Sequence, residues 1–309
     1  MLDISHKSKT LREATATATV KMQPSTVQRA AKGDTPKGNP LEVARVAATQ
    51  AAKNTSSIIP YCHPLPVDFV GVEYEIGEHS ITVSITVKAI YKTGVEMEAL
   101  TAASVAALTL YDMLKMIDNS LVITEVRLIS KRGGKSNFSE ELKRPIRAAV
   151  LVMSDSISKG RKSDRSGKLI VERLQREGIE IMHYQVVPDD ADIIADAVRG
   201  WCDSGGLDLI VTTGGTGLSP RDCTPEAMCP LFEREIPGIP EAMRAYGQER
   251  TPYSMLSRST AGIRGETIII NFPGSTMGVA ESLEAVFPAL KHAFNMLWAG
   301  EHSPAKDPV

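Results

Sequence analysis

The continuous apolar run Ala148-Ala149-Val150-Leu151-Val152 marks the point where this 309-residue sequence changes its pattern. An unbroken apolar strand is expected where both faces of a sheet are covered, which is typical of parallel sheets. Predicted helices and strands alternate after it, as helix 166–177, strand 179–187, helix 192–202, strand 207–213 and, later, strand 267–271 before a last helix. This alternation predicts a three-layer α/β domain over residues 146–300, with a parallel sheet between two layers of helices.

The sequence before this run begins with an alternating threonine and alanine stretch at residues 15–20, which predicts a strand. Asn39-Pro40-Leu41-Glu42 predicts a helix start, because it combines an asparagine cap, an early proline and an acid three residues after the cap. The remaining elements are expected in chain order as a hairpin with strands at 70–76 and 81–87, a helix at 99–117 and a strand at 122–130. This mixture predicts a separate α+β domain over residues 1–140, and the polar stretch 136–147 is the predicted linker.

The composition is ordinary for a soluble chain, and the net charge of −2 argues against a protein that mainly coats nucleic acid. The N-terminus carries no apolar signal core, and no apolar run approaches the length of a membrane span. The four cysteines form no CxxC pair, and their spacing suggests neither a disulfide framework nor a zinc or iron–sulfur site. We therefore expect a cytoplasmic protein that binds neither nucleic acid nor membranes.

Two glycine-containing loops follow strands of the second domain. The first is Thr212-Thr213-Gly214-Gly215-Thr216-Gly217, continued by Ser219-Pro220-Arg221-Asp222, and the second is Asn271-Phe272-Pro273-Gly274-Ser275-Thr276. Glycines let a backbone approach a ligand and turn its N–H groups towards oxygens, although such a loop is also a common form of tight turn. Both loops are expected at the carboxyl edge of the sheet, where phosphates bind. Neither is GxxxxGK[ST] or GxGxxG, which argues against a P-loop ATPase and a dinucleotide dehydrogenase.

Two aspartates at strand ends are candidate metal ligands. Asp222 follows the first loop, and Asp189 follows Val187-Pro188. The simpler interpretations are an ion pair with Arg221 or a helix cap for Asp222, and a solvated turn for Asp189-Asp190. The functional interpretation is that both hold Mg²⁺ against a triphosphate, because Mg²⁺ takes hard oxygen ligands and bridges phosphates.

The string TTGGTG-LSP-RD-CTPEA, with PGS before the last helix, resembles the MoaB/MogA family of molybdopterin-binding domains. The resemblance implies a MogA-like fold and the transfer of AMP from Mg-ATP to the terminal phosphate of molybdopterin, with release of pyrophosphate. It implies that Asp222 and Asp189 are catalytic and hold Mg²⁺. The substrate-binding residues that it implies are Gly214, Gly215, Thr216, Gly217, Arg221, Gly274 and Ser275. The alternative is a non-catalytic module that binds molybdopterin or organises the oligomer.

The first domain contains a group of acids and lysines with one histidine, namely Lys37, Lys53, Cys62, His63, Glu96, Met97, Glu98, Asp112 and Lys115. A histidine before a proline is more often structural than catalytic. Glu96 and Glu98 face the same way if the chain is extended there, and the alternative is a helix N-terminus decorated with acids. Asp112 and Lys115 are three apart on a predicted helix, in an apolar stretch that favours a partly buried pair with tuned acidity. A surface ion pair is the alternative.

Spacing constrains how Glu98 and Asp112 act together. They are 14 positions apart, so one straight helix separates them by about 21 Å. If both are catalytic, the site is expected to be shared between subunits.

The segment IIPYCHPL and the block KTGVEMEALTAASVAALTLYDMLK at residues 92–115 resemble the MoaC family of cyclic pyranopterin monophosphate synthases. The resemblance implies a ferredoxin-like α+β fold, usually hexameric, and conversion of a cyclised GTP derivative to cyclic pyranopterin monophosphate with loss of pyrophosphate. The catalytic residues that it implies are Asp112, Lys115, Lys37, His63 and Glu98. The substrate-binding residues that it implies are Arg12, Lys53, Tyr61, Cys62, His63, Glu96, Met97, Glu98 and Lys131. Several cations suit a triphosphate, because each offers a charge-assisted hydrogen bond.

Two positions depart from the MoaC pattern. The family usually has leucine where Tyr61 stands, and its KGD motif reads Lys37-Gly38-Asn39, with a competing Lys32-Gly33-Asp34 upstream. The spacing from Lys37 to Arg45 favours Lys37. Together the resemblances imply one chain with two steps of molybdenum-cofactor biosynthesis and no tightly bound prosthetic group. The partners expected are pterin and nucleotide substrates, further copies of the chain in a trimer or hexamer, and other proteins of the pathway.

Overall fold

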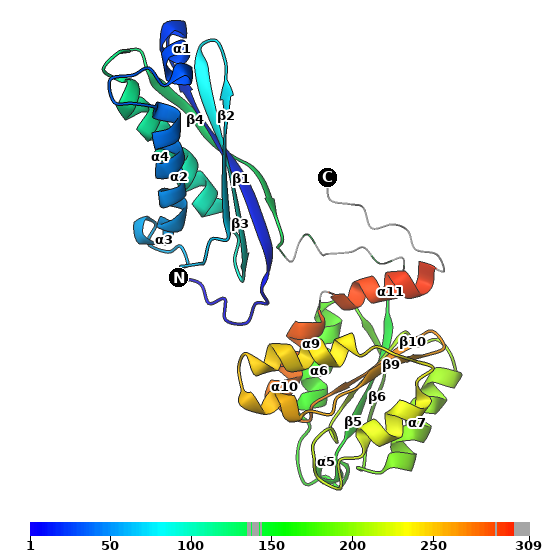
Figure 1. The fold of residues 1–309 in the computed structure, drawn as a ribbon. Coiled ribbons are helices and arrows are strands. Elements are labelled where there is room, and N and C mark those ends of the chain that lie inside the picture. Colours follow the sequence, from blue (N-terminus) through cyan, green and yellow to red (C-terminus); the bar gives the residue numbers. More distant parts are fainter. Residues whose placement is uncertain (135–136, 138–141, 143, 288, 300–309) are drawn as a thin grey trace. The chain divides into compact units, whose positions relative to one another are not determined.

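A computed structural model describes all residues except 135–136, 138–141, 143, 288 and 300–309. The chain divides into two compact units, Met1–Phe138 and Ser139–Val309, which are described separately (Figure 1). Much of the predicted linker 136–147 lies outside the described residues.

The first unit contains a four-stranded antiparallel sheet. Its strands are β1 (Thr10–Lys21), β2 (Phe69–Ile76), β3 (Ser80–Tyr91) and β4 (Val122–Arg132), in the order β2-β3-β1-β4. The helices α1 (Pro24–Lys32), α2 (Pro40–Lys53), α3 (Thr55–Ile58) and α4 (Glu96–Leu114) complete the unit. In Figure 1 both long helices, α2 and α4, lie on one side of the sheet. The sequence did not predict α1 and α3.

Alanines and threonines alternate along the middle of β1, so one face of this stretch carries only small side chains. Ala14, Ala16 and Ala18 are buried under α4, and this helix presents further buried alanines to them. Small side chains on both surfaces let the helix approach the sheet closely. The intervening threonines point to the other face, where the Thr15 and Thr86 hydroxyls lie 3.0 Å apart.

The ends of the two long helices differ in how well the sequence predicts them. The Asn39 side chain accepts hydrogen bonds from the backbone N–H groups of Leu41 and Glu42, so the predicted cap and start of α2 are confirmed. Helix α4 begins earlier than predicted, at Glu96. Because residues two apart on a helix point roughly 200° away from each other, Glu96 and Glu98 do not face the same way. Only the helix N-terminus with acids agrees with the structure.

Helix α4 also corrects the expectation that no apolar run approaches a membrane span. By length and composition alone, its 19 residues are apolar enough to cross a membrane. Its buried face contains five alanines and Leu110, and it packs against β1 and β3 as the core helix of this unit.

The second unit contains a six-stranded sheet in the order β6-β5-β7-β10-β9-β8. The strands β5 (Arg147–Met153), β6 (Glu180–Val187), β7 (Leu209–Thr213) and β10 (Thr267–Phe272) are parallel. Two short strands, β9 (Ala261–Arg264) and β8 (Arg234–Glu235), extend the sheet antiparallel. The sheet is therefore mixed, with the predicted parallel core and an unpredicted antiparallel edge.

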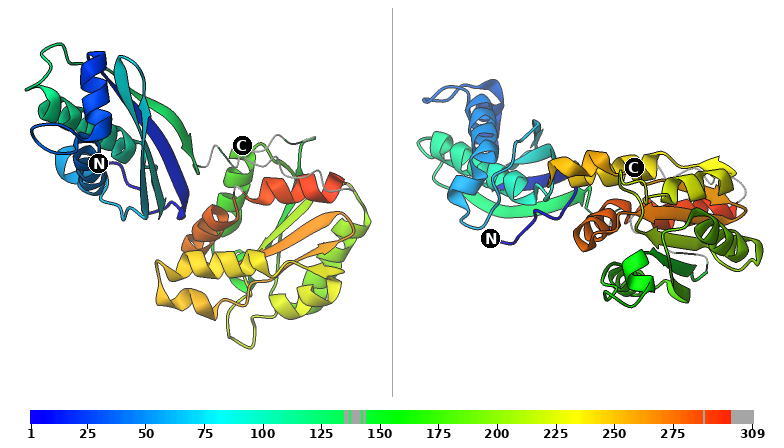
Figure 2. Two further views of the ribbon diagram at one scale, coloured as in Figure 1. Left: turned by 45° about the horizontal axis from the view of Figure 1, so that its top comes forward. Right: turned by 90° about the horizontal axis from the view of Figure 1, so that it is seen from below.

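Helices cover both faces of this sheet (Figure 1 and Figure 2). Alternate residues of β5 belong to two separate cores, Ala148, Val150 and Val152 to one and Ala149, Leu151 and Met153 to the other. The first core is closed by α6 (Ser166–Arg176), α9 (Gly238–Gln248), α10 (Thr276–Val286) and α11 (Ala289–Ala299), and the second by α7 (Ala191–Asp203) and α8 (Thr224–Met228). A continuous apolar strand between two cores is what the opening run of sequence predicts.

Candidate active sites

In the first unit, Asp112 lies between two lysines at the C-terminal end of α4. Lys37, from the loop before α2, places its Nζ 2.7 Å from one carboxylate oxygen, and Lys115 places its Nζ 2.7 Å from the other. The hydrogen bonds from Lys115 and Lys37 lower the pKa of Asp112 to about 2, so this carboxylate is ionised at neutral pH. Asp112 and Lys115 are 54% and 53% exposed, which corrects the expectation of a partly buried pair.

The structure also distinguishes the two competing lysines. Lys32 is the last residue of α1 and is exposed, whereas Lys37 reaches Asp112 and also donates to the Asp112 carbonyl at 3.1 Å. Of these two lysines, only Lys37 is joined to the predicted catalytic carboxylate.

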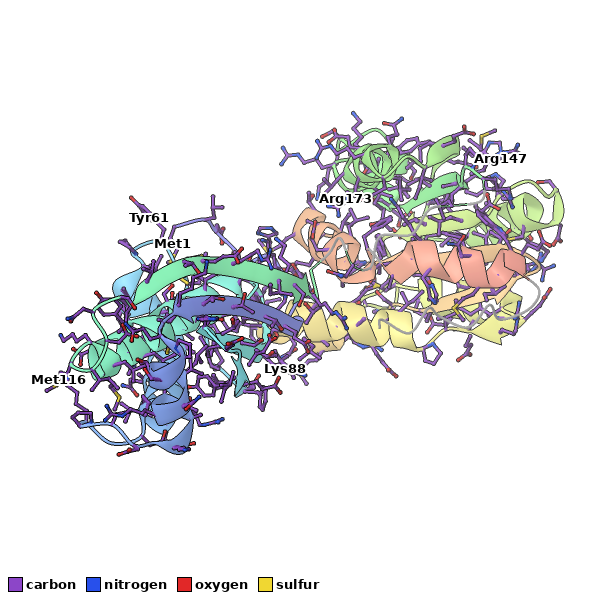
Figure 3. The ribbon with its side chains drawn as sticks, turned by 90° about the horizontal axis from the view of Figure 1, so that it is seen from above. Met1, Tyr61, Lys88, Met116, Arg147 and Arg173 are labelled. Atoms are coloured by element: carbon purple, nitrogen blue, oxygen red, sulfur yellow. The ribbon has the colours of Figure 1, made fainter. Side chains whose placement is uncertain are left out.

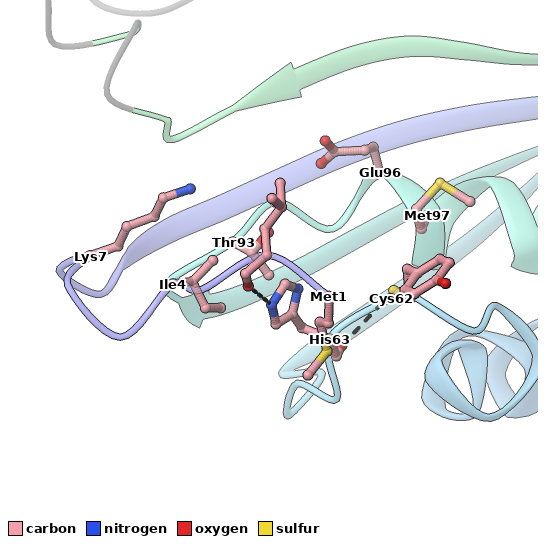
Figure 4. A pocket seen from close by; sticks show the side chains of 11 residues that line it. Met1, Ile4, Lys7, Cys62, His63, Thr93, Glu96 and Met97 are labelled. Atoms are coloured by element: carbon pink, nitrogen blue, oxygen red, sulfur yellow. Dashed lines mark hydrogen bonds between the residues drawn. The ribbon is translucent and has the colours of Figure 1, made fainter.

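A pocket of about 410 Å³ lies at the other end of α4 (Figure 4). It is lined by five residues that the sequence singled out, Tyr61, Cys62, His63, Glu96 and Met97, and by residues of the N-terminal segment such as Leu2 and Lys7. The His63 Nε2 atom lies 2.8 Å from the Leu2 carbonyl oxygen. His63 therefore lines the pocket and also holds the N-terminal segment in place.

The buried Glu98 forms a pair with Cys62, a half-buried residue of the pocket lining. The Cys62 thiol donates to Glu98 Oε1 at 3.3 Å, and the second carboxylate oxygen, Oε2, is buried without a hydrogen-bond partner among the described residues. Burial raises the pKa of Glu98, which is only 2% exposed. Burial and the hydrogen bond to Glu98 raise the pKa of Cys62 to about 12, so the thiol stays protonated at neutral pH.

Three further cations of the predicted site are distributed unevenly. The Lys131 ammonium lies 4.0 Å from a Glu96 carboxylate oxygen. The negative charge of Glu96 also raises the pKa of Arg12, against the lowering effect of burial. The Arg12 Nε donates to the Tyr91 carbonyl at 3.3 Å. Lys53 is exposed at the end of α2. The structure thus places Arg12 and Lys131 near the pocket.

The Asp112 cluster and the Glu98 pocket occupy opposite ends of one helix. In Figure 3, Met116, which follows Lys115, lies well away from Tyr61 and Met1. Glu98 and Asp112 both lie in α4, which runs unbroken from Glu96 to Leu114, and 14 residues of helix span about 21 Å. One subunit therefore does not bring the two groups to one small substrate.

In the second unit, the two predicted loops lie side by side. They follow β7 and β10, which are neighbouring parallel strands, and a Cβ atom on Gly274 would lie 3.3 Å from Gly214 Cα. The Thr213 hydroxyl donates to the Pro273 carbonyl at 2.7 Å. Gly214 and Gly215 have φ values of 110° and 60°, and a Cβ on Gly214 would clash with the Met153 carbonyl, so these positions need glycine.

Other predicted residues of these loops have defined local roles. The Ser275 hydroxyl caps α10 by accepting from the Gly278 N–H at 3.0 Å. Thr216 is buried, and Gly217 lies close to the Asp222 carboxylate. The loops therefore present mainly backbone groups and glycines at their tips.

Among the described residues, Asp222 forms neither the ion pair with Arg221 nor the helix cap of the simpler interpretations. Arg221 forms an ion pair with Asp155, and this hydrogen bond raises the pKa of Arg221. The backbone N–H of Asp155 in turn donates to Asp189 at 2.9 Å, and Asp222 accepts from the Ser219 N–H at 2.9 Å. Asp155 was missed by the sequence analysis, although it follows the end of a parallel strand just as Asp189 does.

The donor set suits a magnesium ion that is also held by phosphates. One oxygen each of Asp222 and Asp189 accepts from a backbone N–H, and among the described residues the second oxygen of each has no such bond. Mg²⁺ usually binds through one or two carboxylates together with substrate phosphates and water. The part of the chain that the structure describes contains no cluster of three or more metal-binding side chains, so phosphates would have to complete the coordination.

Comparison with known proteins agrees with this division. Residues 1–134 match the MoaC family, and residues 149–292 match a family described as a probable molybdopterin-binding domain. The chain is 43% identical over 303 residues to the molybdenum cofactor biosynthesis bifunctional protein of Chlorobaculum tepidum, with 98% of this chain and 96% of that protein covered.

Two comparisons concern single units. The chain is 51% identical over 138 residues to the cyclic pyranopterin monophosphate synthase of Roseiflexus sp., with 44% of this chain and 87% of that protein covered. A crystal structure of MoaB from Thermus thermophilus covers 50% of this chain and 98% of its own, with 46% identity and a TM-score of 0.48. By its near full-length similarity to the Chlorobaculum protein, this chain belongs to the family of bifunctional molybdenum-cofactor biosynthesis proteins, with a MoaC domain followed by a molybdopterin-binding domain of the MoaB/MogA kind.

Proposed function

We propose that the first unit converts 3',8-cyclo-7,8-dihydro-GTP to cyclic pyranopterin monophosphate, with loss of pyrophosphate. The observation that carries this proposal is the ionised Asp112 between Lys37 and Lys115. An ionised carboxylate accepts a proton, and an adjacent lysine returns one or binds a phosphate. The strand order β2-β3-β1-β4, with the long helices on one side, supports assigning this unit to the ferredoxin-like fold.

The second half of this site lies in the Glu98 pocket. A buried carboxyl group with a raised pKa donates a hydrogen bond when it is protonated, and it does so best in a site with little water. Because the pocket and the Asp112 cluster are at opposite ends of α4, we propose that neighbouring subunits of a trimer or hexamer complete each other's sites. Each site then has the acidic pocket from one chain and the lysine-flanked carboxylate from another.

Replacement of Asp112 tests the first reaction. Asp112→Asn keeps the shape of the side chain but removes the base, and we expect cyclic pyranopterin monophosphate formation to fall by about 10² to 10⁴. Glu42→Gln is the matched control, because Glu42 also pairs with a cation three residues away, at 3.6 Å on the exposed face of α2. Equal activity of the two variants would overturn the role of Asp112.

We propose that the second unit transfers AMP from Mg-ATP to the terminal phosphate of molybdopterin. The observation that supports this is the meeting of two glycine loops at one sheet edge, with Asp222 on the continuation of the first loop. Backbone N–H groups of the loops would bind phosphate oxygens. Asp222 and Asp189 would hold Mg²⁺, which neutralises phosphate charge when bound. Arg221 would exchange its partner Asp155 for a phosphate.

The neighbouring pair Asp189 and Asp190 gives a sharp test of this proposal. Asp190 caps α7 by accepting from the N–H groups of Asp192 and Ile193, so its role is structural. We expect Asp189→Asn to lower AMP transfer by about 10²-fold or more, and Asp190→Asn to lower stability with little change in rate. The assay measures adenylylated molybdopterin with Mg-ATP.

A non-catalytic binding module is the second candidate for this unit. It is favoured by two engaged side chains, since Arg221 is paired with Asp155 and the Ser275 hydroxyl is a helix cap. A folded wild-type chain that binds molybdopterin but transfers no AMP would establish this alternative.

A further inference from the structure

Arg258 lies just before β9, and the sequence did not single it out. Its Nε donates to the Gly217 carbonyl at 2.7 Å, one terminal nitrogen donates to the Asp222 carbonyl, and the other forms an ion pair with Glu226. Its backbone N–H also donates to the Thr216 carbonyl at 2.9 Å. One arginine therefore contacts four residues in or beside the first glycine loop.

These contacts close the loop 217–222 across its two ends. Gly217 begins the segment and Asp222 ends it, while Leu218 between them is 66% exposed. Inside the loop, the Asp222 N–H donates to the Ser219 carbonyl, and the Ser219 N–H donates back to the Asp222 carboxylate, both at 2.9 Å. The loop is largely exposed, and the guanidinium group connects its two ends directly. Thr224 adds a second anchor just after the loop, because its hydroxyl and N–H donate to the Gly214 and Gly215 carbonyl groups.

The segment that carries Arg258 is itself anchored in the unit. Arg244 of α9 donates to the carbonyl groups of Ser257 and Ser259, each at 3.3 Å, and Ser259 is buried. Arg258 therefore connects the loop that contains Asp222 to a segment that α9 holds through Arg244, and we call this connection the bridge. A planar guanidinium group with fixed donors suits this task, whereas the lysine ammonium is a single point charge on a flexible chain.

We propose that Arg258 is a positioning residue for AMP transfer, which acts by holding the loop that carries Asp222. The proposal rests on the proposed adenylyltransferase function. Arg258 contributes no group to the substrate in this account, because three of its donors are already engaged by protein oxygens. A carboxylate displaced by about 1 Å can lose on the order of 10² in rate, so we expect an effect of that size when the bridge is removed.

Three variants separate this role from simple charge balance and from stability. Arg258→Ala removes the bridge, and Arg258→Lys keeps a charge for Glu226 but not the connection between the two carbonyl groups. Arg264→Ala is the matched control, because Arg264 pairs with Asp203 through two bonds of 2.9 and 3.1 Å rather than with the loop. Thermal unfolding of each full-length variant checks that the chain is folded.

Two measurements are made on each variant, AMP transfer and amide hydrogen exchange in the loop. We expect both Arg258 variants to slow transfer by about 10- to 100-fold and to speed exchange at Ser219 and Asp222, with Arg264→Ala close to wild type. In an Asp222→Asn background, Arg258→Ala should reduce the residual rate little further, because both changes act through one group.

Full rescue of transfer by Arg258→Lys, or an undiminished effect of Arg258→Ala in the Asp222→Asn background, would overturn the proposal. So would unchanged exchange in the loop, whatever the activity. If the wild-type chain transfers no AMP, the adenylyltransferase proposal fails by itself. The exchange comparison then supports or overturns the bridge on its own.

Discussion

Lys37 and Asp112 are 75 positions apart in the sequence, yet the Lys37 ammonium and the Asp112 carboxylate meet at 2.7 Å. Lys115 completes the arrangement from the other side at the same distance. A carboxylate between two ammonium groups is ionised at neutral pH, and the hydrogen bonds to both lysines fix its direction.

Replacing Lys37 and Lys32 one at a time should show which of the two lysines the first reaction needs. We expect Lys37→Met to lower cyclic pyranopterin monophosphate formation by about 10²-fold or more, because Asp112 loses one of its two partners and the substrate loses a cation. The pKa of Asp112 would rise towards its ordinary value of 3.8, so the carboxylate would still be ionised at neutral pH. Lys32→Met, at the exposed end of α1, is the control and should retain activity. The reverse order of effects would show that Lys32 is the functional lysine.

If each site is shared between two subunits, mixing two inactive variants should restore part of the activity. We expect Asp112→Ala and Glu98→Ala chains to be inactive separately, because each lacks one half of every site. After the two are mixed and refolded together, half of the interfaces contain one chain of each kind. One of the two sites at such an interface is intact, which gives roughly a quarter of wild-type activity for an isologous pairing. Mixtures as inactive as the separate variants would show that each site belongs to one chain.

The buried Glu98 should make stability depend on pH in a defined direction. Burial raises the pKa of Glu98 above its ordinary value of 4.5, so the folded chain binds this proton more tightly than the unfolded chain does. The free energy of unfolding therefore decreases as pH rises from the unfolded pKa through the folded one. Glu98→Gln removes this loss, and its advantage over wild type should be larger at about pH 7 than at about pH 4.

Urea unfolding of the first unit, followed in the full chain at both pH values, measures this difference. Glu96→Gln, at the half-exposed position two residues earlier, is the matched variant. An advantage of Glu98→Gln that grows as pH falls would contradict the assignment of a buried, raised-pKa carboxyl group.

The helix cap at Asn39 should contribute a predictable amount to the free energy of unfolding. The Asn39 side chain accepts from two N–H groups, at 3.0 and 3.3 Å, and Lys37 lies just before it. We expect Asn39→Ala to reduce the free energy of unfolding by about 1 kcal/mol, and Asn39→Asp to retain it, because aspartate caps helices as well as asparagine does. Equal stability of the alanine and aspartate variants would argue against the cap.

Local patterns in the sequence predicted much of this fold. The cap at Asn39 fixed the start of α2, and the apolar run at 148–152 indicated a strand with a core on each face. The short antiparallel strands β8 and β9 were not predicted, because a strand of two or four residues has no periodicity to detect. The start of α4 was misplaced because Glu96-Met97-Glu98 suits both an extended segment and a helix start.

The candidate sites were predicted as sets of residues but not as contacts. Sequence identified Asp112, Lys115 and Arg221, yet the partner of Arg221 is Asp155, which lies 66 positions away. Burial was misjudged for Asp112, because a helix end can be exposed even where the surrounding sequence is apolar. Contacts across such distances depend on how the elements pack, and a single sequence does not show this.

Whether one chain carries two independent reactions is tested most directly by assaying both on the same purified protein. We expect wild type to form cyclic pyranopterin monophosphate and to transfer AMP to molybdopterin. Asp112→Asn should lose the first activity alone, and Asp222→Asn the second alone. A wild-type chain that performs only one reaction, or a variant that loses both while folded, would contradict this expectation.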